Sequence, residues 1–296
     1  MEEFIKGLRE IKKKPEVILL LLIIFLIGGF IEFTYGSVHI GVVFFCVCLV
    51  LLFILTGKKS AGKTRTFKSP ILIAMGAVLI VATLSYNYLS GNPIQTLDSM
   101  VLLLGASLIL ANSNNGQLAE LGAFSFYMSL FFLGFFISLY IIPSRLNIDI
   151  PLYYGHYFVA LPVYGLLKMF GMDLELPAKG LIAVNGVEMT TLKMDLACYG
   201  WYSMFLIVST LLAYTIVIEK YEKHKLLKLI LAMVGASYAA NFLRVLILVV
   251  LTFYYGVDTM MLVHSHLGWV LFTLILLPLL YVFLNAESEI QEEIEK

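Results

Sequence analysis

Apolar runs long enough to cross a lipid bilayer recur along almost the whole chain, and they restrict the fold more than any other feature. A helix needs about 20 apolar residues to cross a hydrocarbon core about 30 Å thick. Of the 296 residues, 60% are hydrophobic and only 14% are charged, a balance too apolar for one water-soluble core. The formal net charge is zero, so no global positive field favours nucleic-acid binding. The sequence therefore predicts an all-α integral-membrane protein, a polytopic helical bundle.

The positions of Lys and Arg set the expected orientation, because basic residues are retained on the cytoplasmic side. Such residues gather before the first apolar run and again in the loop at 57–70, so we place both segments inside. The first run is long enough to be retained as a helix rather than removed as a signal peptide. We expect eight spans with both termini inside. They are residues 17–35, 38–56, 70–90, 97–112, 118–142, 197–218, 227–256 and 262–285.

Two segments between the fifth and sixth spans differ from ordinary spans. Residues 153–171 contain Pro162, and a complete span here would place the lysine-rich residues 219–228 outside. We favour a re-entrant or interfacial element on the outer side over a sixth complete span. Farther along, Asn185 and Gly186 separate two short β-prone stretches. This pattern predicts a small extracytoplasmic β-hairpin with a type I′ turn.

The expected layout brings three reactive side-chain types to one level of the membrane. Cys198 lies at the outer start of its helix, just after the predicted hairpin. Arg244 lies about 24 Å along the next helix, which starts inside, and so returns to the outer leaflet. His264 and His266 lie at the outer mouth of the last expected span. A shared site at the outer surface is the simplest explanation of this convergence.

Each of these residues also has a structural explanation. An arginine inside a span costs about 2.5–3.5 kcal/mol on insertion scales, which favours a function for Arg244 over snorkelling to headgroups. Asn241, on the same helix face, either holds the guanidinium or bonds to a neighbouring helix. Alone, Cys198 would more often be a packing residue, and a lone interfacial histidine an anchor. We expect no metal, because Arg244 would repel a metal ion and no fourth ligand is evident. We also expect no organic cofactor, because acyl transfer by a cysteine needs none.

Taken together, the groups fit nucleophilic catalysis by a cysteine. A nearby cation favours the thiolate form of a thiol, which can attack a peptide carbonyl while a histidine protonates the leaving amine. Arg244 either promotes the thiolate or stabilises the oxyanion that develops on the carbonyl. The residues leave open how protons move among these groups. They also leave open whether water or another nucleophile resolves the thioester.

Three short motifs resemble those of the exosortase and archaeosortase family of membrane cysteine transpeptidases. They occur in the family's order on successive expected helices, and the resemblance covers about residues 150–285. The motifs are ACYGW at 197–201, NFLRV at 241–245 and HSHLGWVLF at 264–272. The Ile- and Lys-rich character of the chain favours the archaeosortase branch.

The resemblance implies a role for each matching residue. Cys198 would be the nucleophile, Arg244 the oxyanion-stabilising or substrate-orienting residue, and His264 the third catalytic member. His264 fits this place better than His266 because Gly268 follows it by four residues. Many members have Ser or Ala directly after the cysteine. Tyr199 stands there in this chain, which bears on pocket shape and substrate choice.

The resemblance also implies a substrate and a location. The family cuts C-terminal sorting signals, made of a short motif, a transmembrane helix and a basic tail, from exported surface proteins. It transfers the new carboxyl end to a membrane lipid or related acceptor. We accordingly expect a multi-pass plasma-membrane protein with an extracytoplasmic active site. It would be one domain, with N-terminal helices at 1–150, a catalytic core at 151–286 and an acidic cytoplasmic tail at 287–296. The alternative is a non-enzymatic transporter or lipid-binding protein, in which the arginine and the histidines hold an anionic group.

Overall fold

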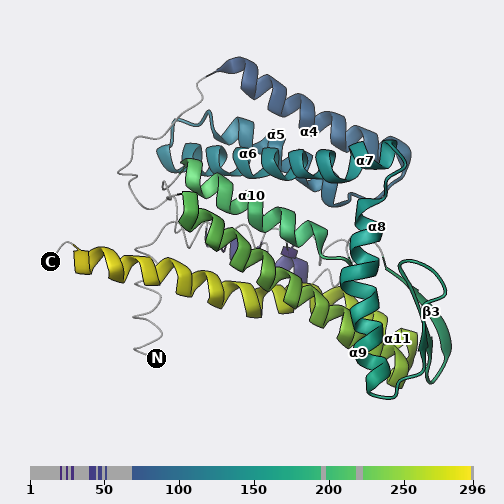
Figure 1. Cartoon of the computed structure of the whole chain (residues 1–296). Helices are drawn as coiled ribbons and strands as arrows, with labels where there is room; N and C mark the ends of the chain where they lie inside the picture. Colours follow the sequence, from purple (N-terminus) through teal and green to yellow (C-terminus); the bar gives the residue numbers. More distant parts are fainter. Residues whose placement is uncertain are drawn as a thin grey trace. The chain divides into compact units, whose positions relative to one another are not determined.

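The computed structural model describes residues 69–194, 198–217 and 223–294, with a few further positions between residues 21 and 51. The first two expected spans, 17–35 and 38–56, therefore lie largely outside the described residues. Figure 1 labels the main helices and one of the strands. The chain divides into two compact units. The first unit comprises Met1–Leu133 with Leu212–Lys220, and the second comprises Gly134–Leu211 with Tyr221–Lys296.

The described part of the first unit is built mainly from a close helix pair, α4 (Pro70–Ser90) and α5 (Thr96–Leu110). Helix α4 begins on a proline, whose missing N–H is not needed in a first turn, and ends at Gly91 with φ 65°. The two helices approach closely where two glycines face one another. A Cβ on Gly76 would lie 2.5 Å from the Gly105 carbonyl oxygen, so any side chain there would force the pair apart.

Three described helical stretches are long and apolar enough to cross a membrane. They are Pro70–Ser90, Leu118–Arg145 and Lys223–His264. Helix α4 leaves large apolar side chains exposed, among them Ile71 at 70% and Tyr88 at 87%, as expected for a helix in lipid. A mostly helical membrane protein with a small sheet is thus confirmed. The number of eight spans stays a prediction.

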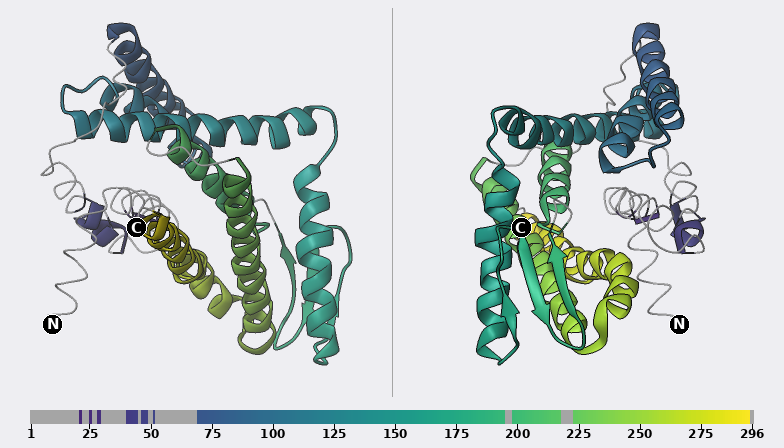
Figure 2. Two further views of the ribbon diagram at one scale, coloured as in Figure 1. Left: turned by 60° about the vertical axis from the view of Figure 1, so that its left-hand side comes forward. Right: turned by 90° about the vertical axis from the view of Figure 1, so that its right-hand side faces the viewer.

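Helix α6 (Gly116–Phe136) continues into the second unit through a π-helical turn, η1 (Ile137–Ile141), and a short helix, α7 (Ile142–Arg145). Three further elements then follow end to end: α8 (Ile150–Tyr154), the π-helical η2 (Gly155–Ala160) and α9 (Leu161–Met169). Asp149 caps this run, because its side chain accepts a hydrogen bond from the Leu152 N–H at 3.0 Å. The run is a single helical column in both views of Figure 2.

This column corrects the expected re-entrant element at 153–171, because the chain does not reverse between Ile150 and Met169. Pro162 has no N–H to donate to the carbonyl of Phe158, four residues earlier. The Tyr238 hydroxyl, from helix α11 (Lys223–Ile294), donates to that carbonyl at 2.6 Å. A neighbouring helix therefore satisfies the group that the proline leaves without its helical donor. The interfacial and complete-span alternatives for this segment stay open.

The predicted hairpin is confirmed, within a three-stranded antiparallel sheet of order β1-β2-β3. The strands are β1 (Leu174–Glu175), β2 (Leu181–Asn185) and β3 (Met189–Lys193). The type I′ turn is wrong. Asn185 is the last residue of β2 and pairs with Met189, so residues 186–188 form the connection. A type I′ turn needs positive φ at both central residues, and neither Asn185 nor Gly186 has it.

Helices α10 (Trp201–Val217) and α11 complete the second unit. Helix α11 consists of two helical arms that meet at Gly256, where φ is 83° and ψ is 175°, a conformation that suits glycine. The arms fold back on one another at this residue, as the left view of Figure 2 shows. The expected loop between residues 256 and 262 does not exist. One glycine supplies the whole reversal, so His264 and His266 lie inside the second arm rather than at its mouth.

Candidate active site

The bend in α11 brings two of the expected catalytic side chains together. Arg244 lies 12 residues before Gly256, and His264 lies 8 residues after it. At 1.5 Å per helical residue, these positions are about 18 Å and about 12 Å from the bend. The Arg244 Nη2 atom lies 3.5 Å from His264 Nε2. Two residues that are 20 apart in sequence therefore meet because one helix folds back on itself.

The Arg244 contact distinguishes the two histidines. A guanidinium carries only hydrogen-bond donors, so as a hydrogen bond this contact uses the lone pair of His264 Nε2. Such a bond corresponds to the neutral tautomer with its proton on Nδ1. His266 is two positions farther along the same arm, about 200° around the helix axis, and so belongs to a different face. The geometry therefore favours His264 as the partner of the arginine.

Gly268 lies one turn after His264 and provides space for the guanidinium. A Cβ on Gly268 would lie 3.4 Å from Arg244 Cζ, 3.5 Å from Nε and 3.6 Å from Nη1. The glycine backbone thus packs against the guanidinium, while the histidine of the preceding turn contacts its Nη2 atom. This arrangement gives a physical reason for a histidine and a glycine four residues apart.

Asn241 connects the nucleophile candidate to the arm that carries the arginine. Its Nδ2 atom donates to the Cys198 carbonyl oxygen at 2.7 Å, and its side chain is only 8% exposed. Of the two expected roles, the bond to a neighbouring element is the one that the structure shows. Because Asn241 and Arg244 are three residues apart on one arm, the backbone of Cys198 is fixed close to the Arg244 position.

The turn at residues 198–200 needs its glycine for two reasons. Gly200 has φ 76°, and a Cβ there would lie 2.8 Å from the Asn241 Cγ. One turn into α10, the Ser203 hydroxyl accepts a hydrogen bond from Ser237 at 3.0 Å, which ties α10 to the first arm of α11 a second time. Cys198 itself is half-buried. Two side chains of α11 therefore hold this region: Asn241 bonds to the turn that carries the thiol, and Ser237 bonds to the first turn of α10.

Tyr199 supports this turn from inside the unit. It is 3% exposed, and its hydroxyl donates to the Met194 carbonyl at 2.8 Å. The ring lies against Gly155 of η2, where no side chain would fit, and the hydroxyl lies close to Gly180. Short π-helical segments are frequent at functional sites, and here η2 packs against Tyr199, the residue next to the cysteine. An influence of Tyr199 on substrate choice stays a prediction and would act through the turn.

An aromatic cluster beside the cysteine turn was not expected from the sequence. Trp201 is 7% exposed and packs edge-on against Tyr154 and Phe205, with ring centroids 5.6 Å and 5.1 Å away. Its indole N–H is buried and makes no hydrogen bond within the part of the chain that the structure describes. The tryptophan is the last residue of the ACYGW motif, and Phe205 follows it by one turn of α10, but Tyr154 lies on α8, which is distant in sequence. Within the described residues, no group of three or more His, Cys, Asp or Glu could hold a metal ion.

Comparison with known proteins identifies the family. The model of the transmembrane exosortase family matches residues 34–281, which is most of the chain. The chain belongs to the transmembrane exosortase family. No curated protein and no solved structure matches this exosortase.

Exosortases are membrane cysteine transpeptidases that act on the C-terminal sorting signals of their substrates. The family match begins well before the three motifs, so it extends the resemblance into the N-terminal helices. It does not distinguish the exosortase from the archaeosortase branch, and it assigns no catalytic residue. The roles of Cys198, Arg244 and His264 are therefore argued from the geometry.

Proposed function

We propose that this exosortase cleaves C-terminal sorting signals with Cys198 as the nucleophile and transfers the new carboxyl end to a membrane lipid or related acceptor. The observation that carries the proposal is the contact between Arg244 and His264, next to the asparagine that holds the Cys198 backbone. A thiol, a cation and an imidazole are the groups that cysteine acyl transfer needs. We assign the protein to the archaeosortase branch on its sequence character.

The first half of the reaction forms a thioester. The Cys198 sulfur attacks the scissile carbonyl carbon, and Nε2 of His264 takes the thiol proton. Because Arg244 contacts Nε2 in the free enzyme, it must release that atom, and the carbonyl oxygen of the substrate offers it a new partner. There the guanidinium stabilises the oxyanion. The peptide C–N bond then breaks, and the imidazolium gives its proton to the leaving amine.

The second half of the reaction resolves the thioester. An acceptor hydroxyl or amine attacks the thioester carbonyl, and His264 takes the proton that this nucleophile loses. The C–S bond breaks, the sulfur leaves as a thiolate, and the carboxyl end is now joined to the acceptor. Cys198 and His264 thus act in both halves of the reaction. Water in place of the acceptor would release a free carboxylate instead.

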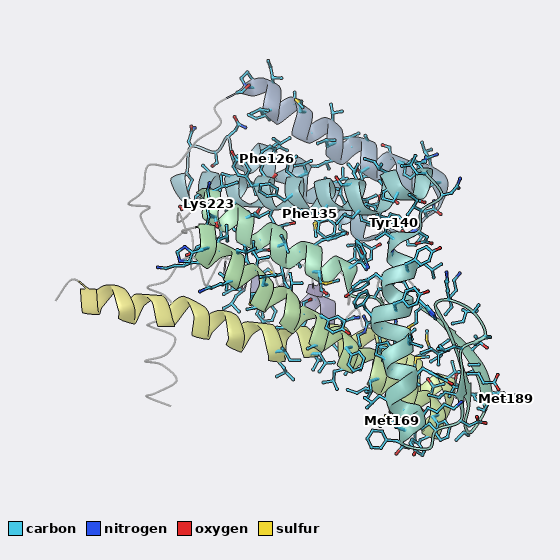
Figure 3. All side chains as sticks on the ribbon, viewed as in Figure 1. Phe126, Phe135, Tyr140, Met169, Met189 and Lys223 are labelled. Carbon is cyan, nitrogen blue, oxygen red and sulfur yellow. The ribbon has the colours of Figure 1, made fainter. Side chains whose placement is uncertain are left out.

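The length of α11 supports a site near the outer membrane boundary. Its first arm runs from Lys223 to the bend at Gly256, about 50 Å at 1.5 Å per residue, whereas the hydrocarbon core is about 30 Å thick. Lys223 lies at the other end of the second unit from Met169 and Met189 (Figure 3). With the basic end of the arm in the cytoplasm, Arg244 comes near the outer boundary and the sheet lies beyond it. We place the enzyme in the plasma membrane because the expected substrates are exported surface proteins.

Replacement of the cysteine tests the proposal. Cys198→Ala should abolish processing of a co-expressed native protein that ends in a short motif, an apolar helix and a basic tail, while the enzyme still accumulates in the membrane. Cys46→Ala is the matched control, because it removes an exposed thiol elsewhere and should leave processing unchanged. Processing by Cys198→Ala at the normal rate would refute the nucleophile assignment. No processing by the parent protein either would favour a non-enzymatic transporter or lipid-binding protein.

Mass spectrometry of the new C-terminus tests the acceptor. A lipid adduct on the processed substrate is the expected product of transpeptidation. A free carboxylate in membranes that contain their native lipids would show that this enzyme is a hydrolase, with the acyl-enzyme step unchanged.

A further inference from the structure

The break in α11 interrupts a backbone hydrogen bond that a continuous helix would make. Val257 is four positions after Phe253, so in a continuous helix the Val257 N–H would donate to the Phe253 carbonyl. The conformation of Gly256, φ 83° and ψ 175°, turns the chain out of helical geometry between them. A bend in a membrane protein leaves two backbone groups that need new partners.

The tip of the β-hairpin, residues 186–188, supplies both partners. The Val187 N–H donates to the Phe253 carbonyl at 3.0 Å. A carboxylate oxygen of Glu188 accepts a hydrogen bond from the Val257 N–H. The hairpin tip thus replaces the lost helical bond with a donor on one side of the bend and an acceptor on the other.

Steric contacts show how closely the hairpin tip enters the bend. A Cβ on Gly186 would lie 2.7 Å from the Phe253 Cα, and a Cβ on Gly256 would lie 2.8 Å from the Glu188 carboxylate. Neither glycine tolerates a side chain without moving the tip or the bend. The carboxylate also lies at the N-terminus of the second arm, where the helix dipole favours negative charge.

We propose that Glu188 is a positioning residue for the catalytic pair, and that the hairpin tip acts by fixing the angle between the two arms of α11. Arg244 lies on the first arm about 18 Å from the bend, and His264 on the second arm about 12 Å from it. A change of about 5° in the bend would move His264 by about 1 Å relative to Arg244. Displacements of about 1 Å can reduce catalysis about 100-fold.

The inference deepens the proposed function and rests on it for its catalytic consequence. The structural claim, that Glu188 fixes the bend, depends only on the contacts of Glu188 with Gly256 and Val257. The two claims can therefore be tested separately, one by the rate of processing and the other by a distance between the arms.

The activity test compares variants that keep or weaken the hydrogen-bond acceptor at position 188. Glu188→Met keeps the length of the side chain but replaces the carboxylate by a thioether, which is only a weak acceptor and carries no charge. We expect the rate of substrate processing to fall about 100-fold with little change in KM. Glu188→Gln keeps a carbonyl oxygen and should retain most of the rate. Val187→Ala is the matched control, because Val187 contributes only its backbone N–H and its side chain is 73% exposed. Equal rates for Glu188→Met and Glu188→Gln would overturn the proposal.

The distance test does not depend on activity. Nitroxide labels on Leu231→Cys and Leu274→Cys, both exposed positions on the two arms, report the bend by double electron–electron resonance in nanodiscs. The background carries alanine at all three native cysteines, so the protein is inactive under the proposed function. Glu188→Met should shift or broaden the distribution of distances, and Glu188→Gln should leave it as in the parent.

The combined results separate the two proposals. An unchanged distribution in Glu188→Met would refute the positioning role whatever the activity shows. A shifted distribution together with full processing by Cys198→Ala would leave Glu188 fixing the bend and would refute only the proposed nucleophile.

Discussion

Replacing Gly268 by valine should disable the enzyme without unfolding it. The position for a Cβ lies 3.4 Å from the Arg244 Cζ, which is an ordinary van der Waals contact, so Gly268→Ala fits. Valine adds two methyl groups about 1.5 Å beyond the Cβ, and at least one of them meets the guanidinium or its neighbours. Arg244 must then move by about 1 Å or more, which corresponds to a loss of about 100-fold, or about 2.7 kcal/mol of transition-state stabilisation.

The assay is the time course of substrate processing in membranes that contain equal amounts of each variant. We expect Gly268→Ala to process within about threefold of the parent and Gly268→Val to be about 100-fold slower. Gly235→Val is the matched control on the same helix, because a Cβ on Gly235 has no neighbour within 4 Å. It makes the same change in composition and helix propensity without approaching the arginine.

Parent-like activity in Gly268→Val would refute the role of the glycine and with it the physical reason for the four-residue spacing. An equal loss in Gly235→Val would show that valine disturbs the helix rather than the guanidinium.

Two further substitutions test the contacts that hold the site. Asn241→Ala removes the donor to the Cys198 carbonyl, and we expect the rate of thioester formation to fall at least tenfold. Trapping the acyl-enzyme with hydroxylamine measures this rate, and an unchanged rate would contradict the role of the hydrogen bond. Tyr238→Phe leaves the Phe158 carbonyl without its donor and should destabilise the protein by about 1–3 kcal/mol in chemical denaturation. Adding Pro162→Ala to Tyr238→Phe should recover part of that loss, because the restored N–H can donate to the same carbonyl; no recovery would contradict the account of the proline.

The approach of Arg244 to His264 could be predicted from the sequence, because the constant rise of a helix determines the relative height of its residues. The catalytic roles of these residues stay predictions. Arg244 follows the lysine-rich residues 219–228 by a known number of residues, and His264 follows a reversal of the chain, so the rise of the helix predicts similar levels for the two. The exact partners could not be predicted. Asn241 was expected to hold the guanidinium or to bond to a neighbouring helix. The choice depends on the turn at Gly200, which brings the Cys198 carbonyl to the asparagine.

The errors in the predicted fold came from residues that serve tertiary contacts. Gly186 suggested a type I′ turn, but the structure uses it for close approach to Phe253. Pro162 suggested an interrupted or re-entrant segment, but the Tyr238 hydroxyl satisfies the carbonyl that the proline leaves. Local patterns identify a residue as unusual, whereas the partner that explains it is distant in sequence. Glu188 was missed for the same reason, since nothing near it in the sequence indicates a broken helix.

The attachment of the site to the two arms implies that its steps depend on different contacts. The turn that carries Cys198 is bonded to Asn241, and Arg244 is on the same arm, so the geometry between the proposed nucleophile and the oxyanion-stabilising group does not involve the bend. His264 alone is on the second arm, and its position relative to the other two depends on the hairpin tip at Gly256. Changes at the tip should therefore impair proton transfer to and from the histidine. Changes at the asparagine should impair attack and oxyanion stabilisation, because they displace the thiol from the arginine.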